Sequence, residues 1–349
     1  MNDTINKIWK YMAMLHVEQL KSSEIYSGIG TDVSLVTVKR HLTEMVESGI
    51  LEVYGKGRST KYTLTTYGIF HAPIDEKEYF ALSEKERKGR RDYNFSLIHD
   101  LASLHILSRE ELLRLEGASK GYKQKVSTLS KSIEKKELER FVIELSWKSS
   151  KIEGNTYTLL DTEKLIKEGV EAPGHSKEES VMILNHKKAF EYCLDLRHEK
   201  TITKDQIYTL HDYLIKGLGV KSGLRNSPVG ITGSSYLPID IPQTIEEEFD
   251  RFVVLLNKLN SSYERALMAV AGISYLQPFE DGNKRTARLL ANTLLLMEGN
   301  APLSYRNVDE ESYRNALLVF YEKNSIEILK KIFIDQYLFS CEYYNINST

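Results

Sequence analysis

Apolar residues recur every three or four positions over most of this chain, which is the spacing of helices that bury one face. From about residue 110 onward nearly every segment has this spacing. We therefore predict a mainly α-helical protein, in which an all-helical larger part follows a small α+β domain. At the amino end the apolar stripes comprise Ile5, Ile8, Trp9, Met12, Val38, Leu42 and Met45.

Two segments of the larger part depart from the ordinary amphipathic pattern. Residues 264–277 are apolar on nearly every side, so we predict a central buried helix that packs against a second helix over 286–300. Residues 217–244 carry Gly, Pro and Ser between two short β-rich pieces, which favours an exposed β-hairpin or flap. An amphipathic helix is predicted over 136–155, ending at the Gly154-Asn155 pair.

Composition narrows the class of protein. A chain of 349 residues suggests two or three domains of ~100–200 residues. The formal net charge of −2 excludes a uniformly basic nucleic-acid binder. Cys193 and Cys341 have neither metal-ligand spacing nor the density of a disulfide scaffold. This cysteine usage indicates a reducing cytoplasm. No apolar run reaches the ~18–20 residues of a membrane span, so we expect no membrane partner.

The stretch "SLVTVKRHLTEMVESGILEVYGKGRSTKYTLT" predicts a helix followed by a hairpin with a basic tip. With the helices before it, this stretch resembles the winged helix-turn-helix family over about residues 3–67, and we assign residues 1–70 to such a domain. The resemblance implies duplex DNA as a partner, with one helix in the major groove and the wing on phosphate. The matching positions are Thr37, Lys39, Arg40, His41, Lys56, Arg58 and Lys61.

Charge leaves a second interpretation of this domain open. Residues 1–70 contain eight Lys and Arg against seven Asp and Glu, so few phosphate contacts are expected. A winged helix used for protein contact or dimerisation is the alternative. The charged residues that follow predict a solvated helical connector over 71–109.

The octapeptide "DGNKRTAR" has the features of an anion site. Gly282 frees the backbone before a helix whose first N–H groups and dipole attract negative charge. Lys284, Arg285 and Arg288 add positive charge, and Asp281 is placed to hold Mg²⁺ beside a phosphate. Taken alone, the pattern also fits a helix start with an acidic cap and solvated bases.

The longer stretch "LQPFEDGNKRTARLLAN" resembles the Fic family, whose signature is His-Pro-Phe-x-(Asp/Glu)-Gly-Asn-x-Arg-x-x-Arg. Only the first position, Gln277, departs from it. We place an all-helical Fic domain with a β-hairpin flap over 110–349. The resemblance implies transfer of AMP from ATP to a hydroxyl of a target protein, the chain itself included.

The resemblance also assigns roles to single residues. Asp281 would hold Mg²⁺; Gly282, Asn283 and Arg285, with Lys284 beside them, would hold the α- and β-phosphates; Arg288 would meet the γ-phosphate. Tyr313 matches a position near adenine. The flap that aligns the target segment by strand pairing comprises Ile231, Thr232, Gly233, Ser234, Ser235 and Tyr236.

A second family element lies at the end of the helix predicted over 136–155. The stretch "SSKIEGN" fits the inhibitory motif (Ser/Thr)-x-x-x-Glu-(Gly/Asn), with Ser149, Glu153 and Gly154 at its fixed positions. The resemblance implies that Glu153 pairs with Arg288 and displaces the γ-phosphate of ATP. Ser149 and Glu153 are four residues apart and so share a helix face.

Gln277 stands where the family has a histidine that takes the proton of the target hydroxyl. An amide cannot do so, and loss of a general base costs ~10²–10⁴ in rate. The chain is then a Fic protein that binds nucleotide without efficient transfer, an AMP-transferase with its base replaced, or an enzyme in which another group serves as the base.

Two functions outside catalysis also stay open. The first is a nucleotide-sensing regulator that binds DNA through the winged helix, and the second is a protein-interaction scaffold. Family members often form homodimers, so a homodimer is one expected assembly.

Overall fold

The computed structural model describes residues 2–15, 19–30 and 32–346, which form two compact units. The first unit comprises Met1–Asp100, Gly230–Leu237 and Glu311–Lys331. The second comprises Leu101–Val229, Pro238–Glu310 and Ile332–Thr349. The domain boundaries at residues 70 and 109 remain predictions.

The first unit begins with short helices and one hairpin. Its elements at the amino end are α1 (Asp3–Met14), α2 (Ser22–Ile29), α3 (Leu35–Glu47), β1 (Leu51–Tyr54), η1 (Gly57–Ser59), β2 (Lys61–Leu64), α4 (Thr66–Phe70), α5 (Glu76–Phe80) and α6 (Phe95–Leu101).

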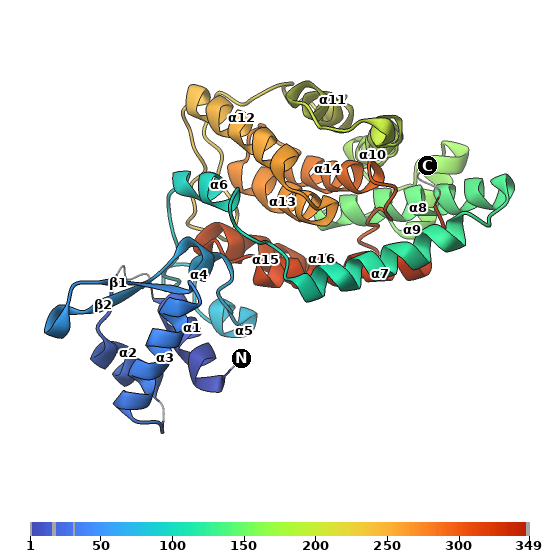
Figure 1. The fold of residues 1–349 in the computed structure, drawn as a ribbon. Coiled ribbons are helices and arrows are strands. Elements are labelled where there is room, and N and C mark those ends of the chain that lie inside the picture. Colours follow the sequence, from blue (N-terminus) through green and yellow to red (C-terminus); the bar gives the residue numbers. More distant parts are fainter. Residues whose placement is uncertain (1, 16–18, 31, 347–349) are drawn as a thin grey trace. The chain divides into compact units, whose positions relative to one another are not determined.

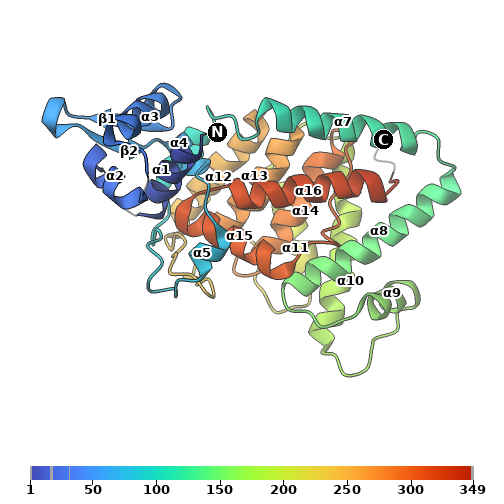
Figure 2. The ribbon, with the colours of Figure 1, turned by 90° about the horizontal axis from the view of Figure 1, so that it is seen from below.

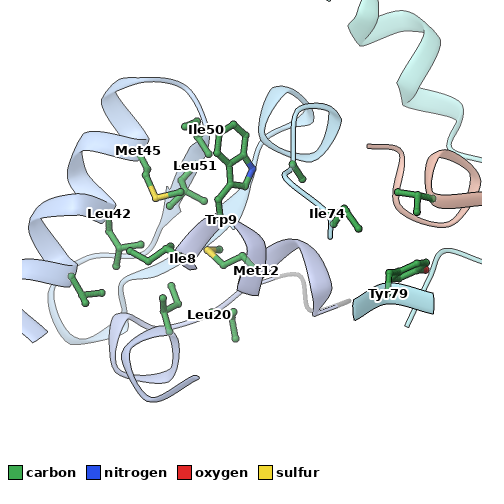
Figure 3. Close-up of a cluster of buried hydrophobic side chains, with 14 residues drawn as sticks. Ile8, Trp9, Met12, Leu20, Leu42, Met45, Ile50, Leu51, Ile74 and Tyr79 are labelled. Carbon is green, nitrogen blue, oxygen red and sulfur yellow. The ribbon is translucent and has the colours of Figure 1, made fainter. Parts of the chain in front are cut away.

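The core of this region is built from the predicted apolar stripes. Ile8 and Leu42 are fully buried, and Trp9 and Met12 pack with them between α1 and α3 (Figure 3). The indole Nε1–H of Trp9 donates to the carbonyl of Gly68 at 2.6 Å, which satisfies the one polar group of that side chain. Burying each aliphatic side chain stabilises the fold by about 1.5–3 kcal/mol.

The predicted hairpin is confirmed. Strands β1 and β2 pair antiparallel, from Leu51 opposite Leu64 to Tyr54 opposite Lys61. Gly55 and Gly57 have positive φ angles in the turn, where residues with a Cβ atom are strained.

The prediction of a helical, solvated connector over 71–109 is wrong for its middle. Helix ends at Phe80 and resumes at Phe95, and the chain between them has turns, a bend and a bridge residue at Asp92. The reason is tertiary. Arg87 is buried with its Nε 3.6 Å from the Glu322 carboxylate, and the Arg90 N–H donates to the Glu322 carbonyl, so contacts with Glu322 hold this segment.

The second unit is helical. Its elements are α7 (Arg109–Val126), α8 (Lys131–Ile152), α9 (Leu159–Glu168), α10 (Lys177–Asp195), η2 (Leu196–His198), α11 (Lys204–Ile215), α12 (Pro242–Lys258), α13 (Ser262–Leu276) and α14 (Asn283–Leu296). The remaining helices, α15 (Glu310–Lys323) and α16 (Glu327–Tyr343), each contribute residues to both units.

The predicted central helix is confirmed as α13, since every one of its residues is buried. Helix α14 packs along α13, and α10 packs on both α8 and α14 (Figures 1 and 2). The close approach to α12 requires Gly272, because a Cβ there would lie 2.1 Å from the ring of Phe252. This arrangement brings the end of α8 and the start of α14 to the same place.

The predicted β-hairpin flap is wrong as secondary structure. Residues 217–241 contain turns, bends and an isolated bridge between Leu237 and Asp92, residues 242–244 begin α12, and the sheet found in the described residues consists of β1 and β2 alone. Contacts with other parts of the chain hold this segment. For example, Arg87 donates to the Gly233 carbonyl, and Ser234 donates to the Glu322 carboxylate. Over the described residues, helices that combine the length and the apolar character needed to span a membrane are absent.

Candidate functional site

The loop between α13 and α14 has an unusual backbone at both ends. Gln277 follows the last residue of α13 with φ +50°, and Gly282 precedes α14 with φ +80°. At Gly282 a Cβ would also lie 3.3 Å from Ile215. The positive φ therefore favours glycine at 282, and packing there is tight, while Gln277 adopts a backbone that side chains other than Asn, Asp and His rarely take.

Asn283 clamps this loop. Its buried amide oxygen accepts from the Phe279 N–H at 2.9 Å, and its amide nitrogen donates to the Phe279 carbonyl at 2.8 Å. The side chain is thus used within the loop, and Asn283 offers an anion its backbone N–H. The first-turn N–H groups of α14 have no helical partner and, with the dipole, make this helix start attractive to phosphate.

Helix α11 contacts the loop through the side chain of His211. The His211 ring stacks on Phe279 with centroids 3.8 Å apart, and its Nε2–H donates to the Asp281 carbonyl at 2.9 Å. Burial lowers the pKa of His211, so the imidazole is neutral at pH 7. A neutral ring here adds no charge beside the loop but fixes the carbonyl directions that shape it.

Two basic residues of the motif, Arg285 and Lys284, lie beside the loop between α13 and α14. Arg285 is almost fully buried and donates to the Asp281 carboxylate at 3.0 Å, and burial lowers its pKa. The side chain of Asp281 is 66% exposed, so its carboxylate is accessible to solvent. Lys284 is half-exposed, with its Nζ 4.0 Å from the Glu153 carboxylate.

Arg288 is turned away from solvent and toward the end of α8. Its side chain is fully buried, with Nε donating to Ser149 Oγ and one terminal nitrogen to the Ser149 carbonyl, both at 2.8 Å. The same nitrogen pairs with the Glu153 carboxylate at 2.9 Å. The predicted Glu153–Arg288 pair is therefore present, and we call Ser149, Glu153 and Arg288 the α8–α14 clasp.

Local structure places Glu153 for this contact. It caps the C-terminus of α8, and Gly154 with φ +95° ends the helix, as the sequence predicted. Burial acts to raise the pKa of Glu153, but Arg288, followed by Lys284, outweighs it and the pKa lies below its usual value. An acid at a helix C-terminus faces the negative end of the dipole, so the arginine provides the compensation.

Comparison with known proteins identifies the domain that carries the loop. The Fic/DOC family profile matches residues 201–295, from just before α11 to the end of α14. The chain contains a Fic/DOC family domain.

Named relatives align with a broader part of the chain than this Fic domain. The protein adenylyltransferase Fic of Nematostella vectensis is 30% identical over 171 residues, which is 47% of this chain and 40% of the relative. The protein adenylyltransferase fic-1 of Caenorhabditis elegans is 28% identical over 44% of this chain and 31% of the relative. The aligned part therefore spans less than half the length of these relatives.

Solved structures support the fold. A Fic domain-containing signalling protein from Bacteroides thetaiotaomicron superposes with a TM-score of 0.57 at 21% identity, over 66% of this chain and 94% of that one. A fragment of Fic-1 from Caenorhabditis elegans gives a TM-score of 0.57 at 19% identity, over 67% and 71% of the two chains. At these identities the likeness concerns the fold alone.

Gln277 has local partners within the Fic domain. The side-chain amide nitrogen of Gln277 donates to the Ser274 carbonyl at 2.6 Å. The backbone carbonyl of Gln277 accepts from Arg225 Nε at 2.6 Å. The buried Arg225 also donates to the carbonyls of Ser227 and Ile239. Gln277 is thus well anchored, yet it brings no group that accepts a proton near pH 7.

The residues predicted to bind adenine and the target lie in the other unit. Tyr313 is buried in α15. Within the predicted flap, Gly233 accepts from Arg87 at 2.5 Å and Ser234 donates to the Glu322 carboxylate at 2.7 Å. Tyr236 is fully buried, while Thr232 and Gly233 are exposed.

The predicted DNA-contacting residues are mostly accessible, with one correction. Lys39, Arg40, Lys56 and Arg58 are exposed, and Thr37 and Lys61 are half-buried. His41 is buried and its Nδ1 lies 2.9 Å from the Glu44 carboxylate, so it does not belong to the exposed face. The reason is helical geometry, since His41 is three residues after the buried Val38 and shares its side of α3.

Three buried polar residues near the loop were not predicted as site residues. They are His186 on α10, His211 on α11 and Arg225. A single sequence carries little signal for them, because a lone histidine or arginine within a helix or a Gly-rich segment looks the same whether it is solvated or buried. Their packing against the loop and the α8–α14 clasp is decided by tertiary structure.

Proposed function

We propose that this chain is a Fic-type protein adenylyltransferase that is restrained by Glu153 and impaired by Gln277. The observation that carries the proposal is the helix start at α14, where Gly282, Asn283 and the buried Arg285 form a cationic loop. Two named relatives are protein adenylyltransferases, which favours the same reaction class here.

The reaction transfers AMP from ATP. A hydroxyl oxygen of the target attacks the α-phosphorus, the bond from that phosphorus to the bridging oxygen breaks, and pyrophosphate leaves. The hydroxyl proton must go to a base, and the family position for that base is Gln277. We therefore infer nucleotide binding with slow transfer, because positioning and charge stabilisation remain while the proton acceptor is missing.

The same proposal includes Mg²⁺. This ion typically takes one or two carboxylates together with phosphate oxygens and water, and Asp281 offers an exposed carboxylate oxygen beside the loop. The described residues hold no group of three or more acidic, His or Cys side chains suited to a metal, which fits an ion bound mainly through the nucleotide. When bound, Mg²⁺ would neutralise charge on the leaving pyrophosphate.

The contacts of Arg288 support the proposed auto-inhibition. Its guanidinium is engaged by Ser149 and Glu153, so it is not available to the γ-phosphate of ATP. A nucleotide without that phosphate needs Arg288 less. We infer that the clasp disfavours ATP relative to ADP and so prevents productive binding.

The flap would act as the docking segment for the target. Thr232 precedes the anchored Gly233, and Ser235 lies between the anchored Ser234 and the buried Tyr236, so the backbone groups of Thr232 and Ser235 would pair with an extended peptide. A homodimer and a cytoplasmic location remain part of the proposal. Both Cys193 and Cys341 are free and buried, as expected in a reducing compartment.

Labelled ATP tests the main proposal. We expect Gln277→His combined with Glu153→Gly to transfer labelled AMP to the chain itself or to proteins of a lysate. Gln277→His alone should stay inhibited, and Glu153→Gly alone should bind ATP and transfer little. If the double variant binds ATP tightly and labels nothing, the adenylyltransferase proposal fails.

A second candidate is a nucleotide-sensing regulator that binds DNA. It is favoured by Gln277 and by the exposed bases of α3 and the hairpin, which suit a winged helix on duplex DNA. Arg40→Ala and Arg58→Ala should each weaken binding and lower the salt slope by about one. The control is Lys7→Ala on α1. No mobility shift at low salt would leave the protein-contact role for this domain.

A further inference from the structure

A buried histidine completes the hydrogen bonding of the α8–α14 clasp. The Nε2 atom of His186 lies 2.6 Å from Ser149 Oγ, and both side chains are fully buried. His186 is on α10, which packs against α8 and α14 (Figures 1 and 2). Three helices therefore meet at the Ser149 hydroxyl.

The direction of each hydrogen bond follows from what the partners can do. A guanidinium only donates, so Ser149 Oγ accepts from Arg288 Nε at 2.8 Å. The hydroxyl keeps one hydrogen to donate, and the nitrogen of His186 is the acceptor within reach. The chain of bonds thus runs from Arg288 to Ser149 to His186.

This order needs a neutral imidazole. An imidazolium has no lone pair and could not accept from the hydroxyl. Burial, followed by the charges of Arg288 and Arg285, holds the pKa of His186 well below its usual value. The other charged group at the clasp is Glu153, whose carboxylate pairs with Arg288 and lies 4.0 Å from Lys284. The ring is therefore neutral throughout the physiological range.

We propose that His186 is a positioning residue of the clasp. By accepting the hydroxyl hydrogen it turns a lone pair of Ser149 toward Arg288 and so keeps Arg288 on Glu153. The inference rests on the proposed auto-inhibition and extends it to α10. Any partner that shifts α10 would weaken the hold on Arg288 without touching Glu153.

The test compares ATP and ADP binding, with Mg²⁺, by calorimetry on the full chain. His186→Phe keeps a ring and removes the acceptor, and we expect the ratio of ATP to ADP affinity to rise about 2–10-fold, the worth of one hydrogen bond. His186→Gln places an amide oxygen in reach of the hydroxyl and should keep the ratio near that of the parent chain. Thermal unfolding checks that each variant is folded.

The Glu153→Gly background separates this inference from the proposed function. In that background His186→Phe should change the ratio no further, because the clasp is already open. If Glu153→Gly alone leaves the ratio unchanged, auto-inhibition itself is wrong. If Glu153→Gly raises the ratio and a folded His186→Phe does not, the role of His186 is overturned and auto-inhibition stands.

A measurement without disruptive variants keeps the proposal testable if His186→Phe fails to fold. Nitrogen-15 spectra of histidine-labelled protein, assigned with His186→Gln, report which ring nitrogen carries the proton. We expect the proton on Nδ1 and a bare Nε2 at pH 7. A protonated Nε2 would reverse the bond to Ser149 and contradict the proposal.

Discussion

Arg288 and Glu153 come from different helices, 135 residues apart in sequence, and pair at 2.9 Å with the arginine fully buried. A buried ion pair whose partner is removed leaves a desolvated charge, which is strongly unfavourable. When Glu153 is absent, pairing with another anion would therefore stabilise the buried Arg288 guanidinium. Under the proposed function, that anion would be the γ-phosphate of an ATP bound at the start of α14.

Replacing Glu153 should separate the two nucleotides. We expect Glu153→Gly to strengthen ATP binding about 10-fold or more and ADP binding much less, because only ATP carries the γ-phosphate. Calorimetry with Mg²⁺ measures both affinities. The control is Glu168→Gly, which changes an exposed glutamate at the last position of α9. Equal gains for both nucleotides would contradict the inhibitory role.

Arg285 should be needed for any nucleotide. We expect Arg285→Ala to lower ATP and ADP affinity alike, by about 1.5–3 kcal/mol, the range for hydrogen bonds to charged groups. The same change frees the Asp281 carboxylate, so Mg²⁺ dependence should be measured in parallel. Arg109→Ala, at an exposed position of α7, serves as the control. Unchanged affinity would remove Arg285 from the phosphate site.

The buried histidine should make stability depend on pH. Folding lowers the pKa of His186 from its ordinary value of about 6.5 in the unfolded chain. Below about pH 6.5 the unfolded chain therefore binds a proton at His186 that the folded chain does not. Stability should then fall as the pH drops from about 7 to 5, by at most ~1.4 kcal/mol per pH unit for this group. Thermal unfolding of His186→Gln should show a shallower fall, and an equal slope in both proteins would mean that His186 titrates normally.

Over the same pH range the stabilising effect of Glu153 should stay constant, unlike that of His186. Its folded pKa is lowered, so its stabilising effect is present above its unfolded pKa near 4.3 and is lost only as the pH falls through the folded value. The preference for ADP over ATP should therefore persist between pH 8 and 5.5. A loss of that preference near pH 6 would point to another titrating group.

The anchor of the flap can be tested through Arg87. Arg87 donates to the Gly233 carbonyl and lies 3.6 Å from the buried Glu322 carboxylate. We expect Arg87→Ala to destabilise the first unit by roughly 3 kcal/mol and to expose residues 230–237 to proteolysis, since the carboxylate loses its cation. Arg91→Ala, at an exposed position nearby, is the control. Unchanged proteolysis would show that the flap is held by other contacts.

Sequence alone determined the features that depend on local pattern. The apolar character of residues 264–277 on every side predicted the fully buried α13, and the Gly282 position predicted the start of α14. The i,i+4 spacing of Ser149 and Glu153 predicted that both would face one partner, and both contact Arg288. These inferences succeed because periodicity and backbone freedom act within a few residues.

Tertiary structure alone decided the rest. His41 is buried rather than exposed, residues between Phe80 and Phe95 are held by Arg87 instead of forming helix, and the flap has no hairpin. The partner of the Ser149 hydroxyl is a histidine 37 residues away. Whether a polar side chain is solvated or buried against a distant partner depends on packing between elements, and that information lies in no single stretch of sequence.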